Sequence, residues 1–186
     1  HLRFGNGPSA EKEFRAAIRR GASDNEVTIL LGRALLLQGK FKEVLRQVKD
    51  DSSDPKIRAQ ILMARARAHL GLRDLENAEK AFKEADSLDH SDVRAKVGLA
   101  QALVNRGKLK DAEALVDEAL KTNADSLESL VLKGELRRLH GELEPAVTYF
   151  DKVLTLNGRN LPARLGRAAS LIDLNRNDEA QADLKA

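Results

Sequence analysis

Residues 93–126 read VRAKVGLAQALVNRGKLKDAEALVDEALKTNADS, and residues 127–160 read LESLVLKGELRRLHGELEPAVTYFDKVLTLNGRN. Aligned on each other, the two stretches share a small residue and, four positions later, a large apolar residue. This spacing recurs through the chain in steps of 34 residues. The small column comprises Ala10, Val44, Ala78, Ala112, Ala146 and Ala180, and the large one Phe14, Val48, Phe82, Val116, Phe150 and Leu184. The chain is therefore built from internal repeats.

Two further columns keep the same register. One holds Ala17, Asp51, Ala85, Ala119 and Val153, and the other holds Gly32, Ala66, Ala100, Gly134 and Ala168. Asp51 is the one clear exception. A small residue lets two helix backbones approach closely, and a large residue one turn later fills the adjoining gap. The pattern predicts an all-α fold in which each repeat is an antiparallel pair of helices.

Turn and cap residues mark where these helices end and begin. Gly39, Gly107 and Gly141 share one repeat position, which favours a left-handed residue after a helix. Asp54 followed by Pro55 is typical of a helix N-terminus. The glycines separate the two helices of a pair, and Asp54 with Pro55 marks the start of the next pair.

Two further starts carry the spacing of a capping box, Ser23 with Glu26 and Asp125 with Glu128. We expect no strand and helices at 9–20, 25–38, 41–50, 55–71, 74–87, 91–106, 109–121, 125–140, 143–156, 159–174 and 177–186.

A helix pair of this length, with small residues at repeat positions 8, 20 and 27, resembles the tetratricopeptide repeat (TPR). Repeats begin at Asn25, Ala59, Val93, Leu127 and Leu161, after a partial repeat over 1–24. The resemblance covers almost the whole chain. It implies a right-handed α-solenoid of about five repeats.

Two repeat positions depart from the family. Position 4, often Trp, is Thr28, Leu62, Lys96, Leu130 and Arg164, and position 7, usually Leu, is Leu31, Arg65, Leu99, Lys133 and Arg167. These departures imply slightly rotated helix faces in some repeats.

The repeat count also places both ends inside a repeat. Residues 1–4 would occupy the end of a first helix, and Ala186 would lie within a second helix. We therefore expect residues 1–186 to be a single array cut at both ends from a longer one. Terminal helices that lack neighbours should expose apolar faces and associate weakly with other copies.

A narrower resemblance rests on two phrases, residues 35–41 (LLLQGKF) and residues 10–15 (AEKEFR). They are similar to the bacterial TPR lipoproteins associated with exosortase (PEP-CTERM) protein sorting and exopolysaccharide loci. The resemblance implies a protein of the bacterial cell envelope.

The composition excludes several classes of protein. Apolar residues make up 42% and charged residues 33%, which is typical of neither a disordered tail nor a membrane protein. The net charge is only +3, with both signs interleaved, so nucleic acid is not an expected partner. With no cysteine in the chain, there can be no disulfide or thiolate site. No apolar run approaches the roughly 20 residues of a membrane span.

Catalytic and metal-binding motifs are not apparent either. His1, His69, His90 and His140 have no metal-ligand spacing. Asp50, Asp51 and Asp54 form a small acidic cluster without the spacing of a calcium loop. The glycine-rich turn at residues 5–8 is not followed by the Lys-Ser/Thr of a phosphate-binding loop. We expect no enzyme activity, cofactor or metal.

The remaining candidate is a surface formed by the first helices, which in TPR arrays line the concave face, mainly through positions 2, 5, 9, 12 and 13. Position 5 is apolar in every repeat, from Ile29 to Leu165, and charged residues flank it. The candidate partner-binding residues are Ile29, Arg33, Leu36, Met63, Arg67, Leu70, Arg94, Val97, Gln101, Val104, Val131, Glu135 and Arg138. Such a groove would suit an extended or helical peptide with apolar anchors. The alternative is that positions 5 and 12 belong to the inter-helix core.

The basic and polar residues of a TPR carboxylate clamp, Lys and Asn at positions 5 and 9, are missing from these repeats. We expect a scaffold that binds a protein or peptide partner. The alternatives are a module that assembles with its own copies, and a regulator that binds nucleic acid or carbohydrate. The last would need a one-sided cluster of arginines or aromatics, which the sequence lacks.

Overall fold

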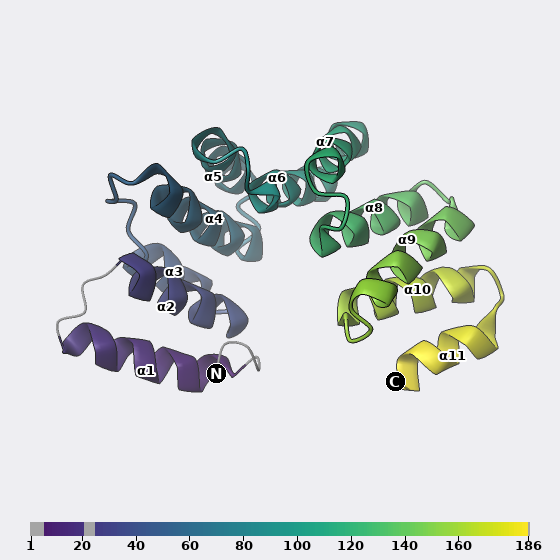
Figure 1. The fold of residues 1–186 in the computed structure, drawn as a ribbon, viewed down its shortest axis with the longest axis horizontal. Helices are drawn as coiled ribbons and strands as arrows, with labels where there is room; N and C mark the ends of the chain where they lie inside the picture. The colour runs from purple at the N-terminus through teal and green to yellow at the C-terminus, as the bar shows by residue number, and fades with distance from the viewer. Residues whose placement is uncertain (1–5, 21–24, 186) are drawn as a thin grey trace. The chain divides into compact units, whose positions relative to one another are not determined.

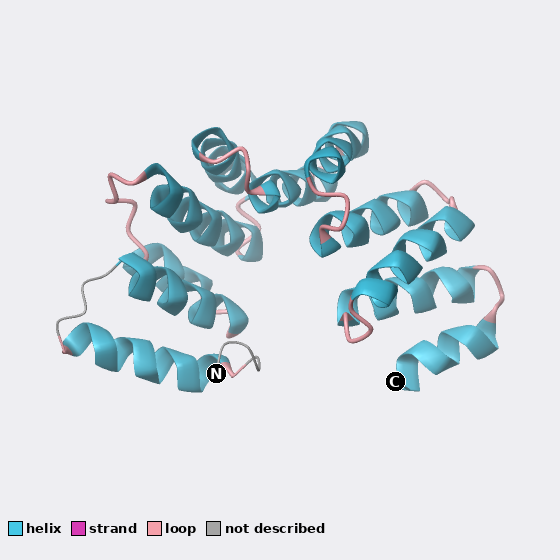
Figure 2. Cartoon of the chain, in the orientation of Figure 1, coloured by secondary structure: helices cyan, strands magenta, loops and turns pink. Residues whose placement is uncertain are grey.

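A computed structural model describes residues 6–20 and 25–185, and every regular element within these ranges is a helix (Figures 1 and 2). The helices are α1 (Gly7–Arg19), α2 (Asn25–Leu37), α3 (Phe41–Gln47), α4 (Pro55–Gly71), α5 (Leu75–Leu88), α6 (Val93–Asn105), α7 (Leu109–Thr122), α8 (Leu127–Leu139), α9 (Leu143–Leu156), α10 (Leu161–Asp173) and α11 (Asn177–Lys185). The predicted all-α fold is confirmed, with most boundaries close to expectation.

The helices fall into two compact units, residues 1–106 with α1–α6 and residues 107–186 with α7–α11. In the first unit, α4 packs against α5 and α5 against α6, and the first helices α2 and α4 also touch. In the second, α8 packs against α9, α9 against α10 and α10 against α11, while α8 also touches α10. Each unit thus has the nearest-neighbour packing of a repeat protein.

The small-residue column lies in the core of each unit. Every member from Ala10 to Ala180 is at most 2% exposed, and Ala112 and Ala146 are completely buried. The adjoining large column is buried at Val48, Phe82, Val116 and Phe150.

The rings of Phe82 and Phe150 fit against glycines of the first helices. In the second unit, a Cβ placed on Gly134 of α8 would lie 2.7 Å from the Phe150 ring, and one on Gly166 of α10 would lie 2.6 Å from its Cε1. In the first unit, the Phe82 ring similarly occupies the space where Gly98 of α6 would carry a Cβ. These glycines are required because a ring packs where a methyl group would be.

The turns repeat as regularly as the core. Positive φ angles occur at Gly39, Gly107 and Gly141, as predicted, and also at Arg73 (60°) and Asn175 (61°). In chain order, each of these five positions lies one full repeat after the one before it. Two repeats therefore adopt the same left-handed turn without the glycine that favours it.

Most cap predictions hold, with two corrections. Asp54 caps α4 by accepting hydrogen bonds from the backbone N–H groups of Lys56 and Ile57. The predicted Asp125 cap is wrong, because α8 begins later than expected and Ser126 Oγ accepts the Ser129 N–H. The Ser23 cap lies outside the described residues.

The second correction concerns α3, which ends at Gln47 rather than at residue 50. The backbone turns at Val48, and the Arg65 guanidinium of α4 binds the carbonyl oxygens of Leu45 and Val48 at 3.0 and 2.9 Å. A cation thus satisfies carbonyls freed at the end of the helix.

Two more cations occupy position 7, where the family usually has leucine. Lys133 of α8 donates to Glu113 and Asp117 of α7 at 2.8 and 2.6 Å. Arg167 of α10 pairs with Asp151 of α9 and with Asp183 of α11. Like Arg65, these side chains link a first helix to neighbouring second helices.

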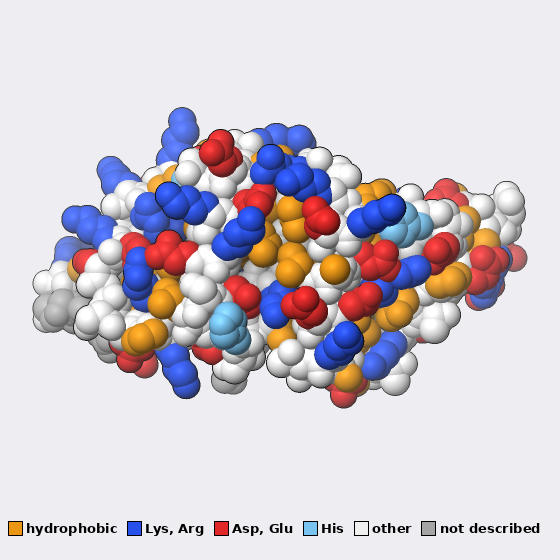
Figure 3. Space-filling model, turned by 90° about the horizontal axis from the view of Figure 1, so that it is seen from above, with side chains coloured by type: hydrophobic (Ala, Val, Ile, Leu, Met, Phe, Trp, Pro, Cys, Tyr) orange, Lys and Arg blue, Asp and Glu red, His pale blue; other side chains and the backbone are white. Residues whose placement is uncertain are grey.

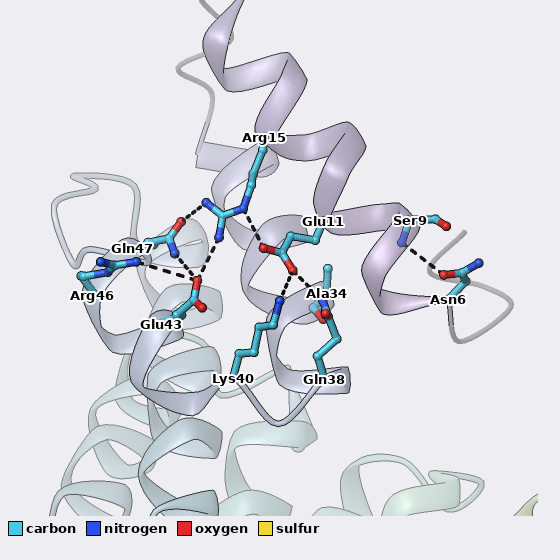
Figure 4. A network of polar contacts seen from close by, with 10 residues as sticks. All are labelled: Asn6, Ser9, Glu11, Arg15, Ala34, Gln38, Lys40, Glu43, Arg46 and Gln47. Carbon is cyan, nitrogen blue, oxygen red and sulfur yellow. Dashed lines mark hydrogen bonds and ion pairs between the residues drawn. The ribbon is translucent and has the colours of Figure 1, made fainter.

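A polar network joins α1 to α2 and α3 (Figure 4). The Glu11 carboxylate accepts hydrogen bonds from Lys40 (2.8 Å), Arg15 (2.7 Å) and Gln38 (2.8 Å), and Arg15 also pairs with Glu43 at 2.9 Å. The Lys40 and Arg15 bonds lower the pKa of Glu11 to about 2.

We predict that Gly166→Ala destabilises the second unit. Overpacking against the buried Phe150 ring costs about 1–3 kcal/mol, against a helix-propensity gain of about 1 kcal/mol. A net loss of about 1 kcal/mol is expected in urea unfolding followed by circular dichroism. The control Gly158→Ala places its Cβ 3.5 Å from the nearest atom, the Leu154 carbonyl oxygen, and should cost less. Equal losses in the two variants would contradict the ring-on-glycine packing.

We predict that Arg73→Gly stabilises the chain by roughly 0.5–1 kcal/mol, because the left-handed conformation costs a residue with a Cβ more than glycine loses in entropy. Asn175→Gly should gain less, because asparagine tolerates this conformation. Thermal unfolding of the two variants tests the ranking, and a loss of stability at Arg73→Gly would show that its side chain makes a compensating contact.

Candidate partner-binding site

The predicted binding residues lie on the first helices, and in the first unit their apolar members are core. Ile29, Met63 and Val97 are 5, 5 and 8% exposed. Met63 packs with Ala59 and Leu62 of its own helix and with residues of α5 and α6. Leu36, Leu70 and Val104 are half-buried. Apart from Leu37 at the end of α2, which is 57% exposed, the first-helix faces of α2, α4 and α6 therefore offer little apolar area to a partner.

The outer layer of these three faces is polar. Arg67 is exposed, and Arg33, Arg94 and Gln101 are half-buried. Arg94 Nε donates to the Asp92 carboxylate at 2.7 Å. Burial by itself would raise the pKa of Asp92, but the hydrogen bonds from Arg94 outweigh it and the pKa is lowered. The Asp92–Arg94 pair thus lies at the N-terminus of α6, where Asp92 is the N-cap.

In the second unit, the corresponding faces of α8 and α10 expose large apolar side chains. Leu165 and Ile172, at positions 5 and 12, are each 51% exposed, and Leu139 and Leu161 are 49 and 62% exposed. Val131 is half-buried. Position 5, which is core in the first unit, is thus half-buried at Val131 and exposed at Leu165.

Leu139, Leu161 and Leu165 border a cleft of about 480 Å³ between α8 and α10. Its lining comprises Glu135, Arg138, Leu139, Leu161, Pro162, Leu165, Gly166 and Ala169. The size is that of a pocket for a small group of side chains.

Helix capping fixes the N-terminus of α10, whose first residues line this cleft. Asn160 is the N-cap of α10, and its side chain accepts the Ala163 N–H at 2.9 Å. Pro162 occupies the first turn, where a missing N–H costs nothing. Leu161 is thereby held at the start of α10, beside the cleft.

The charged residues of the cleft are Glu135 and Arg138 of α8. Burial raises the pKa of Glu135, an effect that the nearby charge of Arg138 only partly offsets. Arg138 is shared with Asp173 of α10, whose Oδ2 lies 4.0 Å from its Nη1. An ionised carboxylate here is poorly solvated and has no full counter-charge of its own.

Two of the predicted residues, Glu135 and Arg138, line this cleft together. Leu139, Pro162 and Ala169 were missed, although they occupy concave-face positions 13, 2 and 9. Extending those columns through α8 and α10 would have found them. Leu161 and Gly166, at positions 1 and 6, have no such signal.

Other candidate sites have structural explanations. Asp50 of the acidic cluster pairs with Arg58 of α4 at 2.9 Å. Within residues 6–20 and 25–185, no group of three or more histidine or acidic side chains is arranged to hold a metal ion. No helix in the same ranges is both long and apolar enough to cross a bilayer. Acidic and basic side chains are interleaved over the face shown in Figure 3.

Two tetratricopeptide repeat models match residues 1–43 and 69–133, and the model of anaphase-promoting complex, cyclosome, subunit 3 matches residues 105–186. No curated protein matches the chain in sequence.

Several solved structures share the fold. A thermophilic TPR protein of Thermus thermophilus is 22% identical, with 92% of this chain and 93% of that chain covered and a TM-score of 0.82. The APC/C hetero-tetramer Cut9-Hcn1 is 14% identical, with 97% of this chain and 35% of that chain covered and a TM-score of 0.81. Pseudomonas aeruginosa pilF is 19% identical, with 98% of this chain and 83% of that chain covered and a TM-score of 0.66. At these identities the likeness concerns the fold alone.

We predict that Glu135→Gln stabilises the chain at neutral pH. A folded pKa above the unfolded value means that stability from the protonated group is present at low pH and is lost as pH rises through the folded pKa. The amide of glutamine does not ionise, so the variant's advantage in stability should grow as the pH rises from about 4 towards neutral. Urea unfolding across this range measures it, with Glu144→Gln on the exposed face of α9 as the control. A variant whose advantage does not grow with pH would contradict the burial of the Glu135 carboxylate.

Proposed function

We propose, because the chain belongs to the tetratricopeptide repeat family, that it is a non-catalytic scaffold whose first helices bind a segment of a partner protein. The TPR fold is in general a protein-interaction scaffold. The observation that carries the proposal for this chain is the cleft between α8 and α10, which is bordered by leucines that are about half exposed. Exposed apolar side chains around a concavity are typical of a binding site.

Within this proposal the two units contribute differently. The cleft of the second unit would take apolar anchors of the partner. The polar faces of α2, α4 and α6, through Arg33, Arg67, Arg94 and Gln101, would contribute hydrogen bonds and charge rather than apolar area. Ile29, Met63 and Val97 would support these faces from beneath.

Self-assembly is the second candidate, and exposed apolar residues on α1 and α11 favour it. Ile18 is 40% exposed and Leu184 is 59% exposed. Association of copies would cover this area, at about 25 cal/mol per Å². Sedimentation over a range of concentrations distinguishes the candidates, since an assembly module forms stable oligomers at low concentration, whereas a scaffold for a foreign partner associates with its own copies weakly at most.

A narrower role in bacterial envelope protein sorting or exopolysaccharide export is also proposed. It is supported only by the sequence phrases at residues 10–15 and 35–41. Fractionation of cells that produce the protein would test it, with recovery away from the envelope as the contrary result.

We predict that Leu165→Ser weakens binding of peptides selected from a random library against the whole chain by roughly tenfold, because it removes a central apolar anchor. Leu156→Ser on α9 is the matched control, since Leu156 is 48% exposed but lies outside the cleft. Fluorescence anisotropy measures both affinities. If the two variants bind alike, the cleft is not the binding site.

A further inference from the structure

The cleft between α8 and α10 is selective in charge as well as in shape. Its border is apolar at Leu139, Leu161 and Leu165, and its floor is formed by Gly166 and Ala169. One carboxylate, that of Glu135, stands among these groups. An acidic group in an otherwise apolar cleft determines which side chains can enter it.

Glu135 has no hydrogen-bond donor among the described residues, and Arg138, one turn further along α8, acts on it only through its charge. Burial raises the pKa of Glu135 despite that charge. Glu135 is half-buried and has no bonded partner among the described residues, so a ligand that supplies a donor would give its carboxylate one.

Arg138 cannot fill this role completely, because it also faces Asp173 of α10 at 4.0 Å. Two carboxylates, Glu135 and Asp173, thus share one guanidinium. These three groups together carry one negative charge in excess when both acids are ionised. A cation is the charge that complements it.

We propose that this cleft binds a protein segment in which an apolar side chain lies next to a lysine or arginine. The apolar side chain packs between Leu139, Leu161 and Leu165, and the ammonium or guanidinium group donates to the Glu135 carboxylate. The inference rests on the scaffold function proposed above and specifies the chemistry of the partner.

Other segments fit less well for electrostatic reasons. An acidic side chain would face Glu135 at close range and be repelled. A wholly apolar segment would cover the Glu135 carboxylate without bonding to it, which leaves a buried charge unpaired. The basic residue is therefore a requirement of the site and not an accessory contact.

Parallel selections from a random displayed peptide library test the inference, using the whole chain and its Glu135→Gln, Glu135→Lys and Glu144→Gln variants. The native chain and the Glu144→Gln control should enrich lysine or arginine beside an apolar residue. The basic enrichment should disappear with Glu135→Gln and become acidic with Glu135→Lys. Glu135→Gln removes a poorly solvated charge, so loss of the fold is not expected to obscure the result.

A double-mutant cycle on one selected peptide makes the test quantitative. Replacing its basic residue with glutamine should weaken binding to the native chain roughly tenfold and leave binding to Glu135→Gln unchanged. Enrichment without basic residues, or a basic preference that survives Glu135→Gln, overturns the inference. Peptides that nevertheless depend on Leu165 would leave the scaffold function standing, whereas peptides indifferent to Leu165→Ser would remove that function too.

Discussion

The packing of a phenylalanine ring against glycine is the contact on which the second unit depends. Phe150 of α9 is completely buried, and both Gly134 of α8 and Gly166 of α10 lack the Cβ that its ring would displace. The Phe150 ring therefore sets how closely α9 approaches both α8 and α10. Cation-to-carboxylate bonds then join these helices to their neighbours, α8 to α7 through Lys133 and α10 to α11 through Arg167.

The same contact shapes the candidate site. Gly166 meets the Phe150 ring and also lines the cleft between α8 and α10. The space of its missing Cβ is taken by the ring, so this one residue belongs to the core and to the lining of the cleft at once. Core packing and cleft shape are therefore coupled at Gly166, and burial raises the pKa of Glu135 in the same lining.

The sequence predicts the fold well because the same spacing of small and large apolar residues recurs in each repeat. The helices, the buried alanine column and the three glycine turns all follow from local periodicity. The early end of α3 does not, because it depends on Arg65 from the following repeat. Nor does the exposure of the apolar position-5 column, since Met63 is buried and Leu165 is exposed according to which helices pack around each.

Because Gly166 belongs to both the core and the cleft, the two parts of the cleft differ in how readily their residues can be substituted during evolution. Its floor is tied to the Phe150 ring, so a substitution at Gly166 alters the core as well as the ligand contact. Leu139 and Leu161 at its border are about half exposed or more, and they can be exchanged at little cost in stability. Related chains could therefore acquire new partners by varying the border while inheriting the floor unchanged.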